Sequence, residues 1–147
     1  MSIEVGQSLP SATLHEGDPG TQVDPAEAFA SGKHVIFAVP GAFTPGCSKT
    51  HLPGYVADAD AIKAKGVESI ACVAVNDAFV MQAWGKEHGA DGKVRMLADP
   101  AGDFTKAVGL DVDAAVLGGT RSKRYAMIVE DGTVTELQVE PDGFGLT

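Results

Sequence analysis

The sequence is poor in cysteine and in positive charge. Only two of its 147 residues are cysteines, and 11 lysines and arginines stand against 20 aspartates and glutamates, for a formal net charge of −9. So few cysteines exclude a disulfide scaffold and are typical of a reducing compartment such as the cytoplasm. The acidic balance argues against nucleic acid or an anionic membrane as the main partner, because both select surfaces rich in lysine and arginine.

Other signals are missing as well. No apolar run approaches the roughly 18 residues of a membrane span, and the first residues do not combine a basic segment with an apolar core, as a secretory signal would. The histidines are scattered without the spacing of a metal site, and no repeat or linker divides the chain. We therefore expect a cytoplasmic protein of one domain, residues 1–147, with no metal and no cofactor.

Short apolar strands alternate with amphipathic helices along the chain. The apolar runs predict strands at 34–40, 67–75 and 94–99. Periodic apolar residues predict a helix from Cys47 onward that ends before Gly66, and further helices at 77–89 and 101–110. The residues expected to face inward in the last two helices are Phe79, Val80, Ala83 and Trp84, and Phe104, Ala107 and Val108.

The end of the chain carries a hairpin signal. Asp131 and Gly132 separate two alternating runs within residues 123–140. Strands that alternate with helices, followed by an antiparallel hairpin, predict an α/β fold with a mixed central sheet and helices on both faces.

Cys47 lies in the segment VPGAFTPGCSKTHLPGY, residues 39–55, where the first expected strand meets the next helix. Open α/β sheets usually bind ligands beyond the carboxyl ends of their strands. The first turn of a helix offers unpaired N–H groups and the positive end of the helix dipole, so a thiol there ionises more readily than a free cysteine. Cysteines also serve as small buried hydrophobes, and the residues alone leave both interpretations open.

The same segment resembles the active site of a known family. Pro40, Thr44 and Cys47 have the Pro-x-x-x-Thr-x-x-Cys spacing of peroxiredoxins, and the longer segment resembles the type II, or peroxiredoxin 5, branch. The resemblance continues through ACVAVNDAFVMQAWGKEH, KVRMLADPAGDF, RSKRYAM and VEPDGFGL, and so covers nearly the whole chain. It implies a thioredoxin-like fold and the reduction of hydrogen peroxide and organic hydroperoxides.

The resemblance also implies a role for each residue of the motif. Cys47 would be the peroxidatic cysteine, which attacks the peroxide and becomes a sulfenic acid. Thr44 would hydrogen-bond the peroxide oxygens, and Pro40 would shield the thiolate from water. The backbone N–H groups of Gly46 and Cys47 would bind the substrate.

The family's active-site arginine precedes an aromatic residue on a late strand. This selects Arg124 in RYAM, with Arg121 as the nearby competitor. A guanidinium there would stabilise the negative charge that develops on the departing oxygen. Without the resemblance, Arg124 would be interpreted as a surface cation of a strand.

The cysteine that would resolve the sulfenic acid is the open question. Many members of the branch carry it just after the segment that corresponds to GLT, and the sequence, which ends at Thr147, has no cysteine there. Either the mechanism uses one cysteine or Cys72 resolves Cys47. A disulfide needs Cα atoms within about 7 Å, and Cys72 lies in the middle of an expected strand, which favours a structural role. The expected reductant is then glutathione with glutaredoxin, or thioredoxin.

Several other residues have two interpretations. Phe43, Phe79 and Leu117 resemble positions that line a homodimer contact in the branch, although each could equally be buried within one subunit. His51 could support the site or be an ordinary helix residue, and Trp84 is expected in the core.

Two competing functions remain. A thiol–disulfide oxidoreductase would normally carry Cys-x-x-Cys, and Thr44 stands in place of its first cysteine. A non-catalytic redox sensor or interaction module would act through oxidation of Cys47 without turnover.

Overall fold

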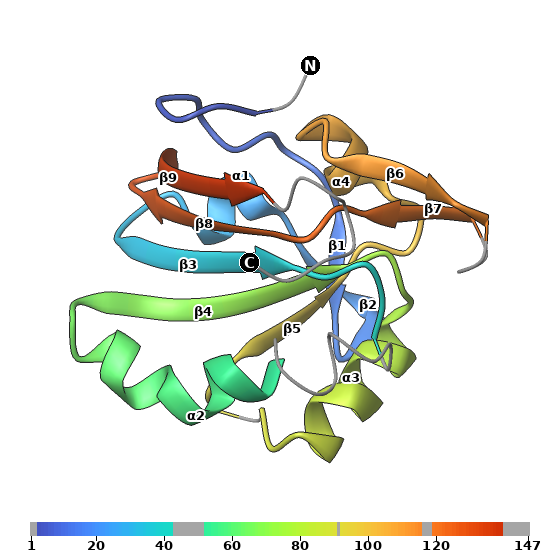
Figure 1. Ribbon diagram of the computed structural model, residues 1–147, viewed down its shortest axis with the longest axis horizontal. Helices are drawn as coiled ribbons and strands as arrows, with labels where there is room; N and C mark the ends of the chain where they lie inside the picture. Colours follow the sequence, from blue (N-terminus) through green and yellow to red (C-terminus); the bar gives the residue numbers. More distant parts are fainter. Residues whose placement is uncertain (1–2, 43–51, 91, 116–118, 140–147) are drawn as a thin grey trace.

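The computed structural model describes residues 3–42, 52–90, 92–115 and 119–139. A seven-stranded sheet in the order β2-β1-β5-β4-β3-β8-β9 forms its centre, and β6 and β7 form a separate ribbon that projects from one end (Figure 1). The strands are β1 (Leu14–Glu16), β2 (Asp18–Val23), β3 (Lys33–Ala38), β4 (Val67–Ala74), β5 (Arg95–Ala98), β6 (Asp111–Ala114), β7 (Gly119–Ser122), β8 (Tyr125–Glu130) and β9 (Thr133–Val139). The helices are α1 (Pro25–Ala28), α2 (Leu52–Lys63), α3 (Ala78–Glu87) and α4 (Asp103–Ala107).

The sheet is mixed, as the sequence predicts. β3, β4 and β5 run parallel to one another, while β8 lies antiparallel to β3, and β1 antiparallel to β5. β8 and β9 form the predicted hairpin, with Asp131 (φ 51°) and Gly132 (φ 80°) between the paired residues Glu130 and Thr133. Two consecutive residues with positive φ are what a two-residue turn of type I′ requires.

The hairpin turn is also tied to the loop that precedes β3. The Asp131 N–H donates to the Gly32 carbonyl at 2.9 Å, and the Gly32 N–H donates to Asp131 Oδ1 at 2.9 Å. These bonds fix the end of the β3–β8 ladder that lies farthest from Ala38 and Tyr125.

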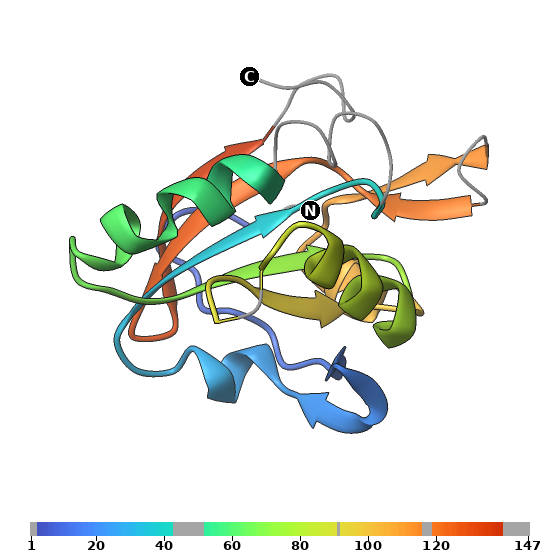
Figure 2. The ribbon, with the colours of Figure 1, turned by 90° about the horizontal axis from the view of Figure 1, so that it is seen from below.

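Both faces of the sheet are covered by helices. Ile36 of β3 belongs to the apolar cluster that contains Phe104 of α4, and α1 packs on this same face. The next residue, Phe37, belongs to the opposite cluster, together with Ala59 of α2 and Trp84 of α3. Figure 2 shows the molecule from below the view of Figure 1, and α2 and α3 there lie on the same side of the sheet. Strands buried on both faces have no polar side, which explains the continuous apolar runs of β3 and β4.

The expected inward face of α3 is wrong in part. Asp77 Oδ1 accepts a hydrogen bond from the Val80 N–H at 2.8 Å and so caps the helix as predicted. However, Ala83 is exposed and the Phe79 side chain is 61% exposed. The stripe that is buried instead comprises Ala78, Met81, Trp84 and Gly85. Apolar residues occur on several sides of this helix, so its spacing alone did not select the buried one.

A similar correction applies to α4. Phe104 and Val108 are buried, as expected, but Ala107 is exposed and Thr105 takes the inward position. The Thr105 N–H and hydroxyl both donate to Asp99 Oδ2, at 2.8 and 2.7 Å, and this pairing satisfies a polar side chain inside the core.

Two pairs of strands were not predicted from the sequence. β2 is exposed along nearly its whole length and contains Pro19, which a strand tolerates at the edge of a sheet. The strands β6 and β7 have four residues each and lack a continuous apolar run.

Candidate active site

The pairing of β3 with β8 brings Pro40 and Arg124 to one edge of the sheet. Ala38 is the cross-strand partner of Tyr125 at the carboxyl end of β3. Pro40 follows Ala38 by two residues, and Arg124 directly precedes Tyr125, so both lie just beyond this last pair. Pro40 is buried and Arg124 is only 5% exposed. The alternative of a surface cation is therefore excluded for Arg124, while its catalytic role stays a prediction.

The chain leaves this edge toward Cys47. Residues 43–51 lie outside the described part of the chain, and they include Phe43, Thr44, Gly46, Cys47 and His51. Ala42 is the last described residue before this segment. The geometry of the edge is thus known up to the residue that leads into the cysteine motif.

An asparagine side chain binds the backbone of Ala42, directly before that segment. Asn76 follows β4 at the same sheet edge, and its Oδ1 accepts a hydrogen bond from the Ala42 N–H at 2.9 Å. The preceding residue, Val75, accepts a hydrogen bond through its carbonyl from Arg121 Nη1 at 3.0 Å. Arg121 therefore contacts the backbone next to Asn76. Asn76 is not among the site residues predicted from the sequence, although a polar residue directly after a buried strand is a usable signal.

We expect Asn76→Leu to lower the free energy of unfolding by about 1–3 kcal/mol, because the partly buried Ala42 N–H loses its acceptor. The rate of the peroxide reduction that the resemblance implies should also fall, by roughly tenfold, because small displacements of reacting groups are costly. Asn76→Asp keeps the acceptor oxygen and serves as the control for stability. Urea unfolding of the two variants checks the expectation, and equal stabilities would contradict it.

A buried carboxylate lies at the same edge, directly after β5. Asp99 is 1% exposed and accepts hydrogen bonds from the Phe104 N–H at 3.2 Å and from Thr105. Burial raises the pKa of Tyr125 well above its usual range, and Asp99 and the thiol of Cys72 raise it further. Tyr125, the neighbour of Arg124, is therefore a neutral phenol at physiological pH.

Cys72 is a core residue. It is 0% exposed, lies in the middle of β4, and pairs with Phe37 on one side and Met96 on the other. The Phe37 ring stacks on Tyr55 of α2 with centroids 4.0 Å apart. Burial raises the pKa of Tyr55, and the nearby Cys72 thiol adds to that effect. The thiol is thus enclosed beneath α2, as its position in an apolar run predicts.

The remaining candidates divide between surface and core. Phe79 is one of two large apolar side chains that are exposed in the described residues, the other being Val5. Trp84 is fully buried, as predicted. Leu117, like Phe43 and His51, lies outside the described residues.

Metal ligands do not gather in the part of the chain that the structure describes. No group of three or more histidine, cysteine, aspartate or glutamate side chains there has a geometry that could hold an ion.

Known proteins resemble this chain over nearly its whole length. The Redoxin family model matches residues 4–144. Peroxiredoxin-2B of Arabidopsis thaliana is 43% identical over 145 residues, which cover 96% of this chain and 90% of that protein. The chain belongs to the peroxiredoxin family. The central sheet and its two helical layers are accordingly a thioredoxin-like fold, as the resemblance implied, and family membership supports a thiol-dependent peroxidase.

Other relatives extend the comparison. The chloroplastic Peroxiredoxin-2E of Arabidopsis thaliana is 45% identical over 149 residues, and the match covers 97% of this peroxiredoxin and 64% of the relative. The chain thus spans less than two thirds of that protein. The crystal structure of reduced Prx3 from Vibrio vulnificus in complex with hydrogen peroxide is 54% identical, with a TM-score of 0.91, and covers 97% of this chain and 92% of that one.

The length and apolar character of the helices can be compared with what a membrane-spanning helix requires. In the described residues, none combines the length and the apolar character that crossing a membrane requires. The relatives include a chloroplastic protein and others without that label.

Proposed function

We propose that the protein reduces hydrogen peroxide and organic hydroperoxides with Cys47 as the nucleophile. The observation that carries the proposal is the β3–β8 register, because the buried Arg124 lies at the edge from which the chain leads to Cys47. Relatives support the substrate class, since Prx3 of Vibrio vulnificus has been solved with hydrogen peroxide. No metal or cofactor is needed, because the sulfur supplies both electrons.

The reaction begins with the thiolate of Cys47. It attacks one peroxide oxygen, so that a sulfur–oxygen bond forms while the oxygen–oxygen bond breaks. The other oxygen leaves with the electron pair of that bond, takes up a proton, and becomes water or an alcohol. Cys47 is left as a sulfenic acid, oxidised by two electrons.

Each neighbouring group has a proposed task in this step. The Arg124 guanidinium favours ionisation of the thiol and stabilises the charge on the departing oxygen. The N–H groups of Gly46 and Cys47, with the Thr44 hydroxyl, bind the peroxide. Pro40, which is buried at the sheet edge, keeps water away from the thiolate.

An external thiol completes the cycle in this proposal. A first thiol condenses with the sulfenic acid to give a mixed disulfide and water, and a second thiol releases Cys47 as a thiolate. Glutathione with glutaredoxin, or thioredoxin, would supply the two electrons. Coupled peroxide-consumption assays with each system identify the reductant, and inactivity of the wild type with both would contradict this route.

Cys72 has a structural role in this proposal. A thiol that is 0% exposed in the middle of a central strand can reach another segment only if the sheet opens locally. We therefore expect Cys72→Ala to keep most of the glutaredoxin-supported turnover, within about threefold, and to cost about 1 kcal/mol of stability as a small core deletion. Steady-state rates and urea unfolding of the same preparation check this. Loss of nearly all turnover in a variant that remains folded would make Cys72 the resolving residue.

The assembly and the compartment are proposed on less direct grounds. We propose a homodimer whose contact includes the exposed Phe79, together with Phe43 and Leu117, because an exposed aromatic side chain is a typical anchor of an interface. We also propose that residues 1–147 act as one domain in the cytoplasm, where reducing thiols are available. Sedimentation of the wild-type chain tests the dimer.

A further inference from the structure

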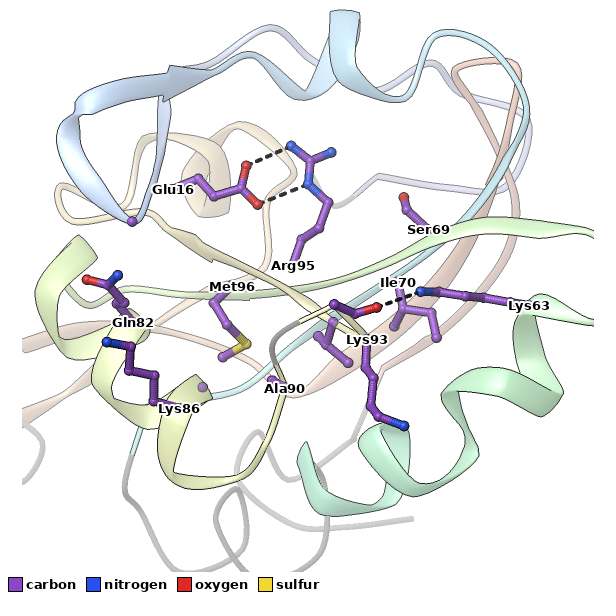
Figure 3. A pocket seen from close by; sticks show the side chains of 14 residues that line it. Glu16, Lys63, Ser69, Ile70, Gln82, Lys86, Ala90, Lys93, Arg95 and Met96 are labelled. Carbon is purple, nitrogen blue, oxygen red and sulfur yellow. Dashed lines mark hydrogen bonds and ion pairs between the residues drawn. The ribbon is translucent and has the colours of Figure 1, made fainter.

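A cleft of about 400 Å³ lies on the side of the molecule where β5 begins. It is bordered by α2, α3 and the first residues of β5 (Figure 3). Ala71 of β4 pairs with Arg95, the first residue of β5, so the cleft lies near the amino ends of these parallel strands. Pro40 and Asn76 lie beyond their carboxyl ends. The cleft is therefore separate from the candidate active site.

The residues that line the cleft carry a net positive charge, whereas the whole chain is acidic. Among the described residues that line it, four are cationic, Lys63, Lys86, Lys93 and Arg95, and one is acidic, Glu16. The whole chain has 11 lysines and arginines against 20 acidic residues. A concave surface lined by one sign of charge concentrates counter-ions. In a protein of net charge −9, this local excess points to an anionic ligand.

The charge of Arg95 is compensated by Glu16, so Arg95 stabilises the structure around the cleft rather than attracting a ligand. Its Nε and Nη2 donate to the two carboxylate oxygens of Glu16, at 3.1 and 2.9 Å. This bidentate pair joins β5 to β1, and the Arg95 guanidinium lies 5.8 Å from the centre of the Phe29 ring. Glu16 is thereby neutralised, so it opposes an anion less.

The three lysines remain available to a ligand. Lys63 Nζ donates to the Gly92 carbonyl at 3.2 Å, and a neutral acceptor leaves its charge uncompensated. Lys93 Nζ is 4.0 Å from an oxygen of Asp60, whose side chain is 91% exposed, so that pair is weak. Lys86 is exposed, and its side chain makes no hydrogen bond or ion pair with the described residues.

An apolar floor lies between these cations. Figure 3 shows Lys86 and Lys63 on opposite sides of Met96 and Ile70. Met96 occupies space that a side chain at Gly85 would need, because a Cβ built there would be 2.7 Å from Met96 Cγ. Met side chains adapt readily to ligands of different shape. The cleft thus offers an apolar surface for the body of a ligand and ammonium groups for its charged end.

We propose that this cleft binds a small organic dianion, in which an aromatic or aliphatic body carries a phosphate or two carboxylates. Its volume falls in the range of about 300–1,000 Å³ that is usual for small-molecule sites. The lysines act as separate point charges rather than as a bidentate fork, so they accept either kind of anion. The phosphate ligand and the dicarboxylate ligand share one chemistry, namely two negative charges next to an apolar group.

Isothermal titration of the wild-type chain with phenyl phosphate, phthalate and inorganic phosphate tests the proposal. We expect one equivalent of phenyl phosphate or phthalate to bind, and inorganic phosphate to bind roughly tenfold more weakly because it lacks the apolar body. A preference between the first two probes distinguishes phosphate from carboxylate. Absence of saturable binding of both up to about 10 mM, against the usual affinities of such sites, would overturn the proposal.

Three matched variants locate the binding. Lys86→Gln and Lys93→Gln should each lower the affinity for the more tightly bound probe about three- to tenfold, as expected for loss of one charged contact. Lys106→Gln on α4 changes the net charge equally, outside the residues that line the cleft, and should leave binding unchanged. An equal loss in Lys106→Gln, or none in the cleft variants, would contradict the assignment. Peroxide turnover of Lys86→Gln without probe should stay near wild type, which separates this test from that of Cys47.

Discussion

Replacement of Cys47 by serine is expected to abolish peroxide consumption. The oxygen of serine is protonated at neutral pH and cannot take the place of a thiolate, so the rate should fall by roughly a thousandfold or more. The measurement is the initial rate of peroxide loss with glutaredoxin and glutathione, and separately with thioredoxin. In the wild type, one sulfenic acid per chain should form in the absence of reductant, and a dimedone-type probe should detect none in Cys47→Ser.

Cys72→Ala is the matched control for this experiment. It removes the other of the two thiols of the chain, from a position that is fully buried. Full activity in Cys47→Ser would refute the proposed mechanism at its centre. Stoichiometric oxidation of wild-type Cys47 without turnover under either reductant would instead favour the redox sensor over the peroxidase.

Arg124→Gln is expected to lower the second-order rate constant for peroxide by about 100- to 1,000-fold, the usual effect of removing one group that stabilises a developing oxyanion. Arg124 is 5% exposed, so its charge acts in a region of reduced water content. The thiol should also ionise at a higher pH without the neighbouring cation. The pH profile of Cys47 alkylation in the two proteins measures this shift directly.

Two further variants distinguish a catalytic Arg124 from a structural one. Arg124→Lys keeps the charge but not the planar set of donors, so it should restore the ionisation of the thiol more fully than the peroxide rate. Arg121→Gln removes the hydrogen bond to the Val75 carbonyl. The second-order rate constant for peroxide should then fall by no more than about tenfold, as expected for a residue that only positions others. A larger loss in Arg121→Gln than in Arg124→Gln would exchange the roles of the two arginines.

The order of the elements was predictable because the central strands are buried on both faces. β3 and β4 stand out as continuous apolar runs, and the Asp131–Gly132 turn is specified by residues that tolerate positive φ. β2 gives no such signal, since an exposed edge strand has no need of apolar side chains. The buried side of α3 was not predictable from its spacing, because the neighbouring strands decide which of several apolar sides turns inward.

The candidate site was predictable where residues adjacent in sequence form it. The motif around Cys47 and the RYAM segment with Arg124 can be recognised one by one. The contact between Asn76 and Ala42 joins residues 34 positions apart and depends on the parallel pairing of β3 with β4. The lysines of the cleft come from α2, α3 and the segment before β5, so no local pattern reveals them. Such groups become visible only when packing brings separate elements together.

The hairpin turn at Asp131 has a consequence far from its own location. β8 spans six residues between that turn and Arg124, a length of about 20 Å at the usual rise per residue. Side chains alternate between faces, so a slip of one position in the β3–β8 ladder would reverse the direction of every side chain on β8. The bonds between Asp131 and Gly32 therefore help to decide where a guanidinium lies at the opposite end of the strand. Substitutions in this remote loop and at Arg124 are thereby expected to be epistatic, although the two positions lie at opposite ends of β8.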